Sequence, residues 1–176
     1  DTGLGFVVVQ HLAPTYASSL AEILSRSTPM TVIEVKDEAR VEPNHVHVIP
    51  PGKTMVIVER NLKLQPREGI GQHHPIDIFF RSLAQDQGDT SMGVVLSGTG
   101  NDGTAGLREI KAAGGITFAQ DESAQHDGMP RSAIAAQCVD FVLPPQRIAE
   151  EIARIAHHPY IGCSAPAASG SATSVK

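Results

Sequence analysis

A histidine and an aspartate, His11 and Asp102, each follow an apolar run that predicts a buried strand. The run 6–10 ends beside His11, and the run 92–96 leads into the glycine-rich segment 97–103 that carries Asp102. Open α/β sheets place their functional residues at the carboxyl ends of such strands. An imidazole oriented by a carboxylate is a general base, and the pair would form two-thirds of a Ser-His-Asp triad. No serine or cysteine lies in a recognisable strand–elbow–helix turn that would supply the nucleophile.

The segment around Asp102 also allows two other interpretations. Asp102 alone could cap the helix that follows it, because aspartate and asparagine favour that position. A cap needs one polar residue, however, whereas Gly98, Gly100 and Gly103 indicate a turn with positive φ or a close backbone approach to a substrate. A phosphate-binding loop is the weakest alternative, because the segment lacks G-x-x-x-x-G-K-[ST] and lacks G-x-G-x-x-G with its following acidic residue.

The other histidines form no recognised metal-binding pattern. His45 and His47 would share one face of a strand, and His73 and His74 precede a predicted helix. No H-E-x-x-H or cysteine-rich spacing accompanies them. We therefore expect hydrogen-bonded or solvated histidines, with no metal and no cofactor. His73 and His74 could still line the same cleft as His11.

Strands that alternate with helices must position these residues. Apolar runs predict the strands, and helical spacing with proline starts and a glycine stop predicts the helices. We expect strands at 6–10, 31–35, 46–49, 55–58, 62–64, 92–96, 116–119 and 139–143. We expect helices at 17–27, from residue 75, from 103 to 113, at 129–134 and at 146–156. The hairpin 55–64 would extend the sheet edge in antiparallel fashion. The alternation indicates an α/β fold with a doubly wound, mostly parallel sheet in three α/β/α layers.

The composition is typical of one folded domain. The chain has 176 residues, 41% hydrophobic and 19% charged, which is typical of a globular protein. The formal net charge is −5 and no basic run occurs, so we expect no nucleic-acid partner. No apolar stretch reaches the roughly 20 residues of a membrane span, so we expect no direct membrane insertion. Cys138 and Cys163 form no disulfide framework, which favours a cytoplasmic location, and Cys138 should be a small buried residue.

Four motifs follow one another along the chain: Val9–Leu12, Pro75–Asp77, Ser97–Gly103 and Asp127–Ile134. In this order they resemble the catalytic domain of chemotaxis protein-glutamate methylesterases, the CheB family. The resemblance covers residues 1 to about 155. We expect a catalytic domain over 1–158 and a disordered linker or tail over 159–176, where small and polar residues dominate. The amino-acid sequences of segments 1–11, 96–106 and 121–145 most resemble those of methylesterase domains fused to a receptor methyltransferase.

The resemblance implies an activity and a set of site residues. Family members hydrolyse glutamate γ-methyl esters on chemoreceptors, and some deamidate glutamine, through a Ser-His-Asp triad. His11 matches the general base and Asp102 matches the carboxylate that orients it. The active-site loops would include Gln10, Gly98, Thr99, Gly100, Asn101, Met129 and Pro130, with Thr99 at a position where the family commonly has methionine.

The family's nucleophilic serine lies in a Gly-Ala-Ser-[Ala/Thr]-Gly-Gly turn before the histidine, and that turn is absent here. We therefore expect the nucleophile upstream of Asp1 and an inactive chain in isolation. The segment Ile161–Ala165 resembles the turn only superficially, because no helical pattern follows it.

The resemblance also implies partners: a methyl-accepting chemoreceptor as protein substrate, and a methyltransferase or receiver domain beside this one in the parent chain. Two alternatives remain. One is a non-catalytic regulatory or docking module of a multidomain two-component signalling protein. The other is an unrelated nucleotide-binding domain that uses the loop Gly98–Gly103.

Overall fold

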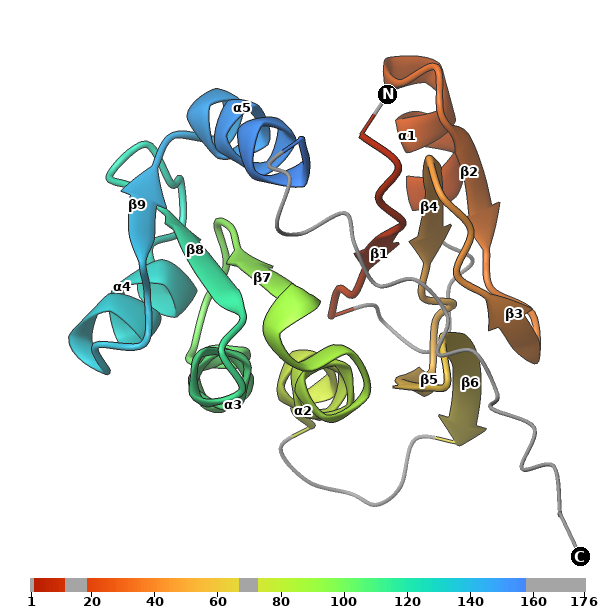
Figure 1. Cartoon of the computed structure of the whole chain (residues 1–176), viewed down its shortest axis with the longest axis horizontal. Helices are drawn as coiled ribbons and strands as arrows, with labels where there is room; N and C mark the ends of the chain where they lie inside the picture. Colours follow the sequence, from red (N-terminus) through yellow and green to blue (C-terminus); the bar gives the residue numbers. More distant parts are fainter. Residues whose placement is uncertain (1, 12–18, 67–72, 158–176) are drawn as a thin grey trace, which may run out of the picture.

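The computed structural model describes residues 2–11, 19–66 and 73–157 (Figure 1). Its strands are β1 (Phe6–Val8), β2 (Thr31–Glu34), β3 (Glu38–Arg40), β4 (His45–Val48), β5 (Lys53–Val58), β6 (Asn61–Pro66), β7 (Met92–Val95), β8 (Ile116–Gln120) and β9 (Phe141–Leu143). Its α-helices are α1 (Leu20–Ser27), α2 (Pro75–Gln87), α3 (Thr104–Ala112), α4 (Gly128–Ala135) and α5 (Pro145–Ala156), and a short 3-10 turn at Gly88–Thr90 follows α2. None of the helices in these ranges has the length and hydropathy of a membrane span.

Two parallel sheets form the frame of the domain. Their strand orders are β1-β4-β2 and β7-β8-β9, and every pair within them is parallel. The second sheet has α2, α3 and α4 on one face and α5 on the other (Figure 1). This layering is the predicted α/β arrangement. In the described residues, the predicted single sheet is two separate sheets, and the break lies between β1 and β7.

The predicted hairpin is present, but its place in the fold differs from the expectation. β5 and β6 pair in antiparallel register around the turn Glu59-Arg60, whose φ angles of 52° and 62° fit a type I′ turn. They form a separate antiparallel sheet with β3 rather than extending a parallel one. The hairpin packs against α2, whose apolar face would otherwise lack cover on that side.

Most predicted helices have the apolar faces that their spacing indicates. Ile76, Phe79 and Phe80 of α2 are buried, as expected. The exception is α1, which buries no residue fully and leaves Ile23 58% exposed. The first residues of the helix predicted over 17–27 lie outside the described residues, as do the predicted tail 159–176 and the segment 161–165.

A cavity of about 800 Å³ separates the two parallel sheets. Its walls are the β1 segment, α2, β7 and α5, with Phe6, Phe79, Phe80, Met92 and Ile152 among the lining side chains. β1 and β7 are edge strands of their sheets in the described part of the chain, and they face each other across this cavity (Figure 1). The fold therefore has room for extended chain between β1 and β7.

Candidate active site

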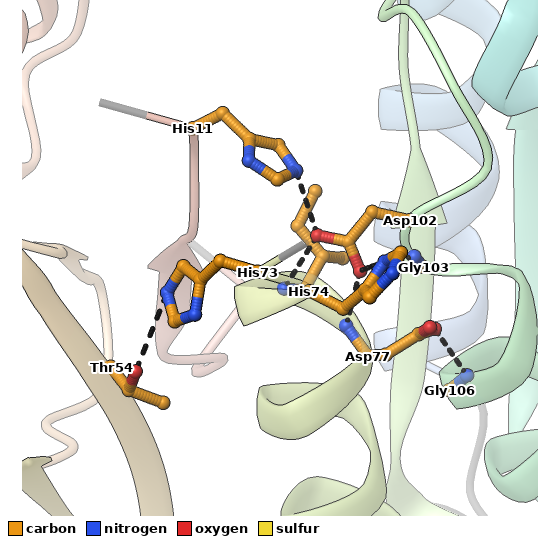
Figure 2. A network of polar contacts seen from close by, with 9 residues as sticks. His11, Thr54, His73, His74, Asp77, Asp102, Gly103 and Gly106 are labelled. Atoms are coloured by element: carbon orange, nitrogen blue, oxygen red, sulfur yellow. Dashed lines mark hydrogen bonds and ion pairs between the residues drawn. The ribbon is translucent and has the colours of Figure 1, made fainter. Parts of the chain in front are cut away.

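His11 and Asp102 meet at the carboxyl ends of the two edge strands. The imidazole Nε2 of His11 lies 2.8 Å from a carboxylate oxygen, Oδ2, of Asp102 (Figure 2). His11 follows β1 and Asp102 follows β7, so the ends of both strands point to one site. The predicted pairing of these two residues is therefore present in the structure.

The two side chains differ sharply in exposure. The Asp102 side chain is 4% exposed, whereas the His11 side chain is 47% exposed. A buried carboxylate that donors surround holds a fixed position, and the histidine can present its other face to a reactant. Because the ionised carboxylate accepts from Nε2, the neutral imidazole carries its proton there. The lone pair that accepts a proton is then on Nδ1.

Backbone amides hold Asp102 in place. Its oxygens accept hydrogen bonds from the N–H groups of Ile76 at 3.0 Å, Asp77 at 2.9 Å and Gly103 at 2.9 Å. Ile76 and Asp77 belong to the first turn of α2, which begins with Pro75. Asp102 thus satisfies amides that a helix start leaves open. The positive end of α2 also stabilises negative charge on this carboxylate.

The interpretation of Asp102 as the cap of the helix that follows it, α3, is therefore wrong. The residue before α3 is Gly103, with φ of 90° and no side chain to cap with. Asp102 caps α2 instead, a helix that lies 25 residues earlier in the chain.

Several amides of segment 97–106 donate to protein oxygens, and this opposes the phosphate-loop alternative. Ser97 N–H donates to the Gln120 side chain and Gly98 N–H donates to the His126 carbonyl, at 2.9 and 2.8 Å. At the start of α3, the Gly106 N–H donates to Asp77 at 2.7 Å. The amides of Gly103 and Gly106, where α3 begins, therefore donate to carboxylates that would repel a phosphate.

The predicted loop residues after β7 form a tight junction with the start of α4. Met129 N–H donates to the Gly98 carbonyl at 2.9 Å, and a Cβ at Gly98 would come within 2.4 Å of the Met129 sulfur. Met129 and Pro130 are buried, whereas Thr99, Gly100 and Asn101 are exposed. These residues shape the loop that carries Asp102, and among the described contacts none of them touches His11.

A small hollow lies beside His11. It is lined by Gln10, His11, Pro50, Gly52, Lys53, His73 and Pro75. Gln10 was predicted in an active-site loop, and His73 was a residue that could line the cleft of His11; both are among the lining residues of this hollow. His74 also reaches the site, with Nδ1 3.7 Å from Asp102 (Figure 2).

Sequence reasoning missed Lys53 and the hairpin start. β5 brings Lys53 to the hollow, and Thr54 Oγ1 lies 3.4 Å from Nε2 of His73 (Figure 2). No local signal connects residues 50–54 with His11, because the hairpin reaches the site by packing on α2. The local sequence indicates that a hairpin begins after Pro50-Pro51-Gly52, but it does not indicate that this hairpin lies near His11.

Three side chains at the site could by type hold a cation: His74, Asp77 and Asp102 offer atoms within 4.8 Å of one another. However, both Asp102 oxygens and Asp77 Oδ1 already accept N–H groups. The start of α2, whose partial charge is positive, adjoins them. This arrangement suits ionised carboxylates held by amides better than a metal ion.

The remaining titratable candidates have structural environments. His45 and His47 share one strand face, with ring centroids 6.3 Å apart. His47 is buried, its Nε2 accepts the Glu42 N–H, and burial followed by the charge of His45 lowers its pKa. Cys138 is buried as expected, and burial raises the pKa of its thiol. None of these three residues contacts His11 or Asp102 in the described part of the chain.

The comparison with known proteins agrees with this geometry. The family model described as CheB methylesterase matches residues 1–152. The chain belongs to the CheB methylesterase family. The crystal structure of the Thermotoga maritima CheB methylesterase catalytic domain superposes with a TM-score of 0.79 and 29% identity, over 88% of this chain and 86% of that one. The α/β three-layer fold class is thereby confirmed.

Sequence relatives have the same character. A protein-glutamate methylesterase/protein-glutamine glutaminase of Bordetella parapertussis is 39% identical over 153 residues, which is 83% of this chain and 44% of that protein. A relative of the same name in Pectobacterium atrosepticum is 36% identical over 157 residues, covering 86% and 45%. An uncharacterized 104.1 kDa protein of Rhodobacter capsulatus is 44% identical over 135 residues, 76% of this chain but 14% of that protein. The CheB-family chain therefore spans less than half the length of these relatives.

Proposed function

We propose that this chain supplies the general base and its orienting carboxylate to a protein-glutamate methylesterase. The observation that carries the proposal is the 2.8 Å contact between half-exposed His11 and buried, amide-held Asp102. In a serine esterase, a buried carboxylate accepts a hydrogen bond from the imidazole that acts as general base. The names of the Bordetella and Pectobacterium relatives support glutamate methyl ester as substrate.

The reaction would be acyl transfer to a serine. The serine oxygen bonds to the ester carbonyl carbon while Nδ1 of His11 takes the hydroxyl proton. When the tetrahedral intermediate collapses, the bond from carbon to the methoxy oxygen breaks and His11 returns its proton, so methanol leaves. Water then repeats the sequence on the acyl-enzyme and releases the glutamate carboxylate. Asp102 holds the Nε2–H tautomer throughout and stabilises the imidazolium.

We propose that the serine comes from chain preceding Asp1 in the parent polypeptide. The cavity between β1 and β7 supports this proposal. It has room for a further strand, and both flanking strands have unpaired edges in the described residues. A strand between them would end beside His11 and Asp102, at the carboxyl edge where the site lies.

Methanol release from a methylated chemoreceptor tests the assignment. The enzyme is the parent polypeptide, meaning this chain with the segment that precedes it in its natural protein. We expect His11→Gln and Asp102→Asn to lower kcat by about 10⁴-fold. Asp140→Asn is the matched control, because this carboxylate also accepts a backbone N–H, that of Thr117, and none of its described contacts is with His11. Wild-type turnover in His11→Gln would contradict the role of His11.

The isolated chain 1–176 should release no methanol under the same conditions. Turnover close to that of the parent polypeptide would refute a nucleophile upstream of Asp1. Turnover in neither protein would favour the non-catalytic module instead. The proposal also includes a chemoreceptor as partner and a cytoplasmic location. It further includes a neighbouring receiver or methyltransferase domain, and glutamine deamidation as a second activity.

A further inference from the structure

A second buried carboxylate, Asp77, lies beside the proposed acid–base pair and has no part in the mechanism above. Asp77 is 8% exposed and belongs to the first turn of α2. Its Oδ1 accepts the Gly106 N–H at 2.7 Å, and its own backbone N–H donates to Asp102 Oδ1 at 2.9 Å (Figure 2). The two acids therefore hold each other's helices: Asp102 holds the start of α2, and Asp77 holds the start of α3.

The start of α3 depends on this support. Gly103 at its N-cap has no side chain, and no side-chain cap is formed from within α3. The two helices also touch closely, since a Cβ at Gly106 would lie 2.4 Å from Cβ of Phe80 and 3.2 Å from Cα of Asp77. Asp77 thus supplies from α2 the acceptor that α3 lacks.

This bond bears on Asp102 through one short stretch of backbone. Asp102 is four residues before Gly106, and its carboxylate must face both α2 and His11. If the Gly106 N–H loses its acceptor, the start of α3 is free to move away from α2. The Asp102 carboxylate would move with it, and the contact with His11 Nε2 would lengthen.

We propose that Asp77 is a positioning residue for the His11–Asp102 pair. It acts as a hydrogen-bond acceptor that fixes the start of α3, and it does not touch the reacting atoms. The kinetic consequence rests on the proposed methylesterase function, whereas the geometric consequence does not. A displacement of about 1 Å at a catalytic group can lower turnover by about 100-fold.

Three variants of the parent polypeptide separate positioning from general stability. Asp77→Ala removes the acceptor, and we expect kcat to fall about 10- to 100-fold with little change in KM. Asp77→Asn keeps an oxygen that can accept the Gly106 N–H, and we expect it to restore most of kcat. Asp86→Ala is the matched control, because the Asp86 carboxylate accepts backbone N–H groups of Glu59 and Arg60 near the other end of α2.

The Nε2–H proton of His11 gives a readout on the chain 1–176 itself, without any esterase assay. In ¹⁵N-labelled wild-type protein we expect a protected Nε2–H resonance shifted downfield by the Asp102 hydrogen bond. It should disappear or move upfield in Asp77→Ala and persist in Asp77→Asn and Asp86→Ala. If Asp77→Ala does not fold, Asp77→Ser replaces it, with a smaller loss of kcat expected because its shorter hydroxyl lengthens the Gly106 bond.

The proposal is overturned if the alanine variant, or the serine variant in its place, keeps wild-type kcat and the wild-type Nε2–H resonance. It is also overturned if Asp86→Ala lowers kcat as much at equal loss of stability. Absence of methanol release from the wild-type parent polypeptide would refute the methylesterase proposal alone. The resonance would then still decide whether Asp77 positions the pair.

Discussion

Replacing Asp102 by alanine should destabilise the fold, and replacing its partner His11 should not. Asp102 accepts three buried backbone N–H groups besides the His11 imidazole. An amide that loses its acceptor costs about 1–1.5 kcal/mol, so Asp102→Ala should lower the free energy of unfolding by about 3–5 kcal/mol. Asp102→Asn keeps one oxygen acceptor and should cost about half as much. His11→Ala removes a half-exposed contact worth about 1 kcal/mol or less.

Urea denaturation of the chain 1–176 at neutral pH, followed by far-UV circular dichroism, measures these differences. The midpoint should shift strongly for Asp102→Ala and little for His11→Ala, with the same m-value in both. An Asp102→Ala variant within 1 kcal/mol of wild type would show that the amides of α2 find other partners. Equal losses in the two variants would show that the hydrogen bond between His11 and Asp102, and not the capping of α2, holds the site together.

Three further predictions concern groups away from the site. Burial lowers the pKa of His47 below its ordinary 6.5, so the folded state binds a proton at His47 less well than the unfolded state. The free energy of unfolding should therefore fall as the pH drops below about 6.5, and His47→Gln should flatten that decline in urea titrations. Burial raises the pKa of Asp140, but its hydrogen bonds with Lys111 and Thr117 outweigh burial and hold that pKa below its ordinary 3.8. The ionised carboxylate should therefore stabilise the fold fully above pH 3.8, and this stabilisation should fade as the pH falls through the lowered pKa. Asp140→Asn should abolish this pH dependence in urea titrations. Burial raises the pKa of the Cys138 thiol, so iodoacetamide should label Cys138 only in urea, as peptide mass spectrometry can show; rapid labelling of the native protein would contradict the buried environment.

The parts of the fold that follow from local pattern could be predicted from the sequence. Each of these signals spans only a few residues: the apolar run of β7, the helical spacing of α2, and Gly114, which ends α3 with φ of 86°. Pairing that joins distant segments could not be predicted. β3 has two charged residues in three, and it pairs with a segment distant in the sequence, where Ala39 lies opposite Leu62.

The candidate site divides in the same way. His11 and Asp102 were predictable because each follows a strand run, and parallel strands bring such ends together. The capping of α2 by Asp102, the bond from Gly106 to Asp77 and the approach of Lys53 were not predictable. Each depends on how α2 packs against α3 and against the hairpin, which no local spacing records.

Covalent labelling of the parent polypeptide tests the central assignment, a serine activated by His11. A fluorophosphonate ester reacts with an activated serine: the serine oxygen bonds to phosphorus as fluoride leaves. We expect mass spectrometry to locate the adduct on a serine that precedes Asp1, with labelling lost in His11→Gln and retained in Asp140→Asn. An adduct on a serine within residues 1–176, or undiminished labelling without His11, would contradict the account.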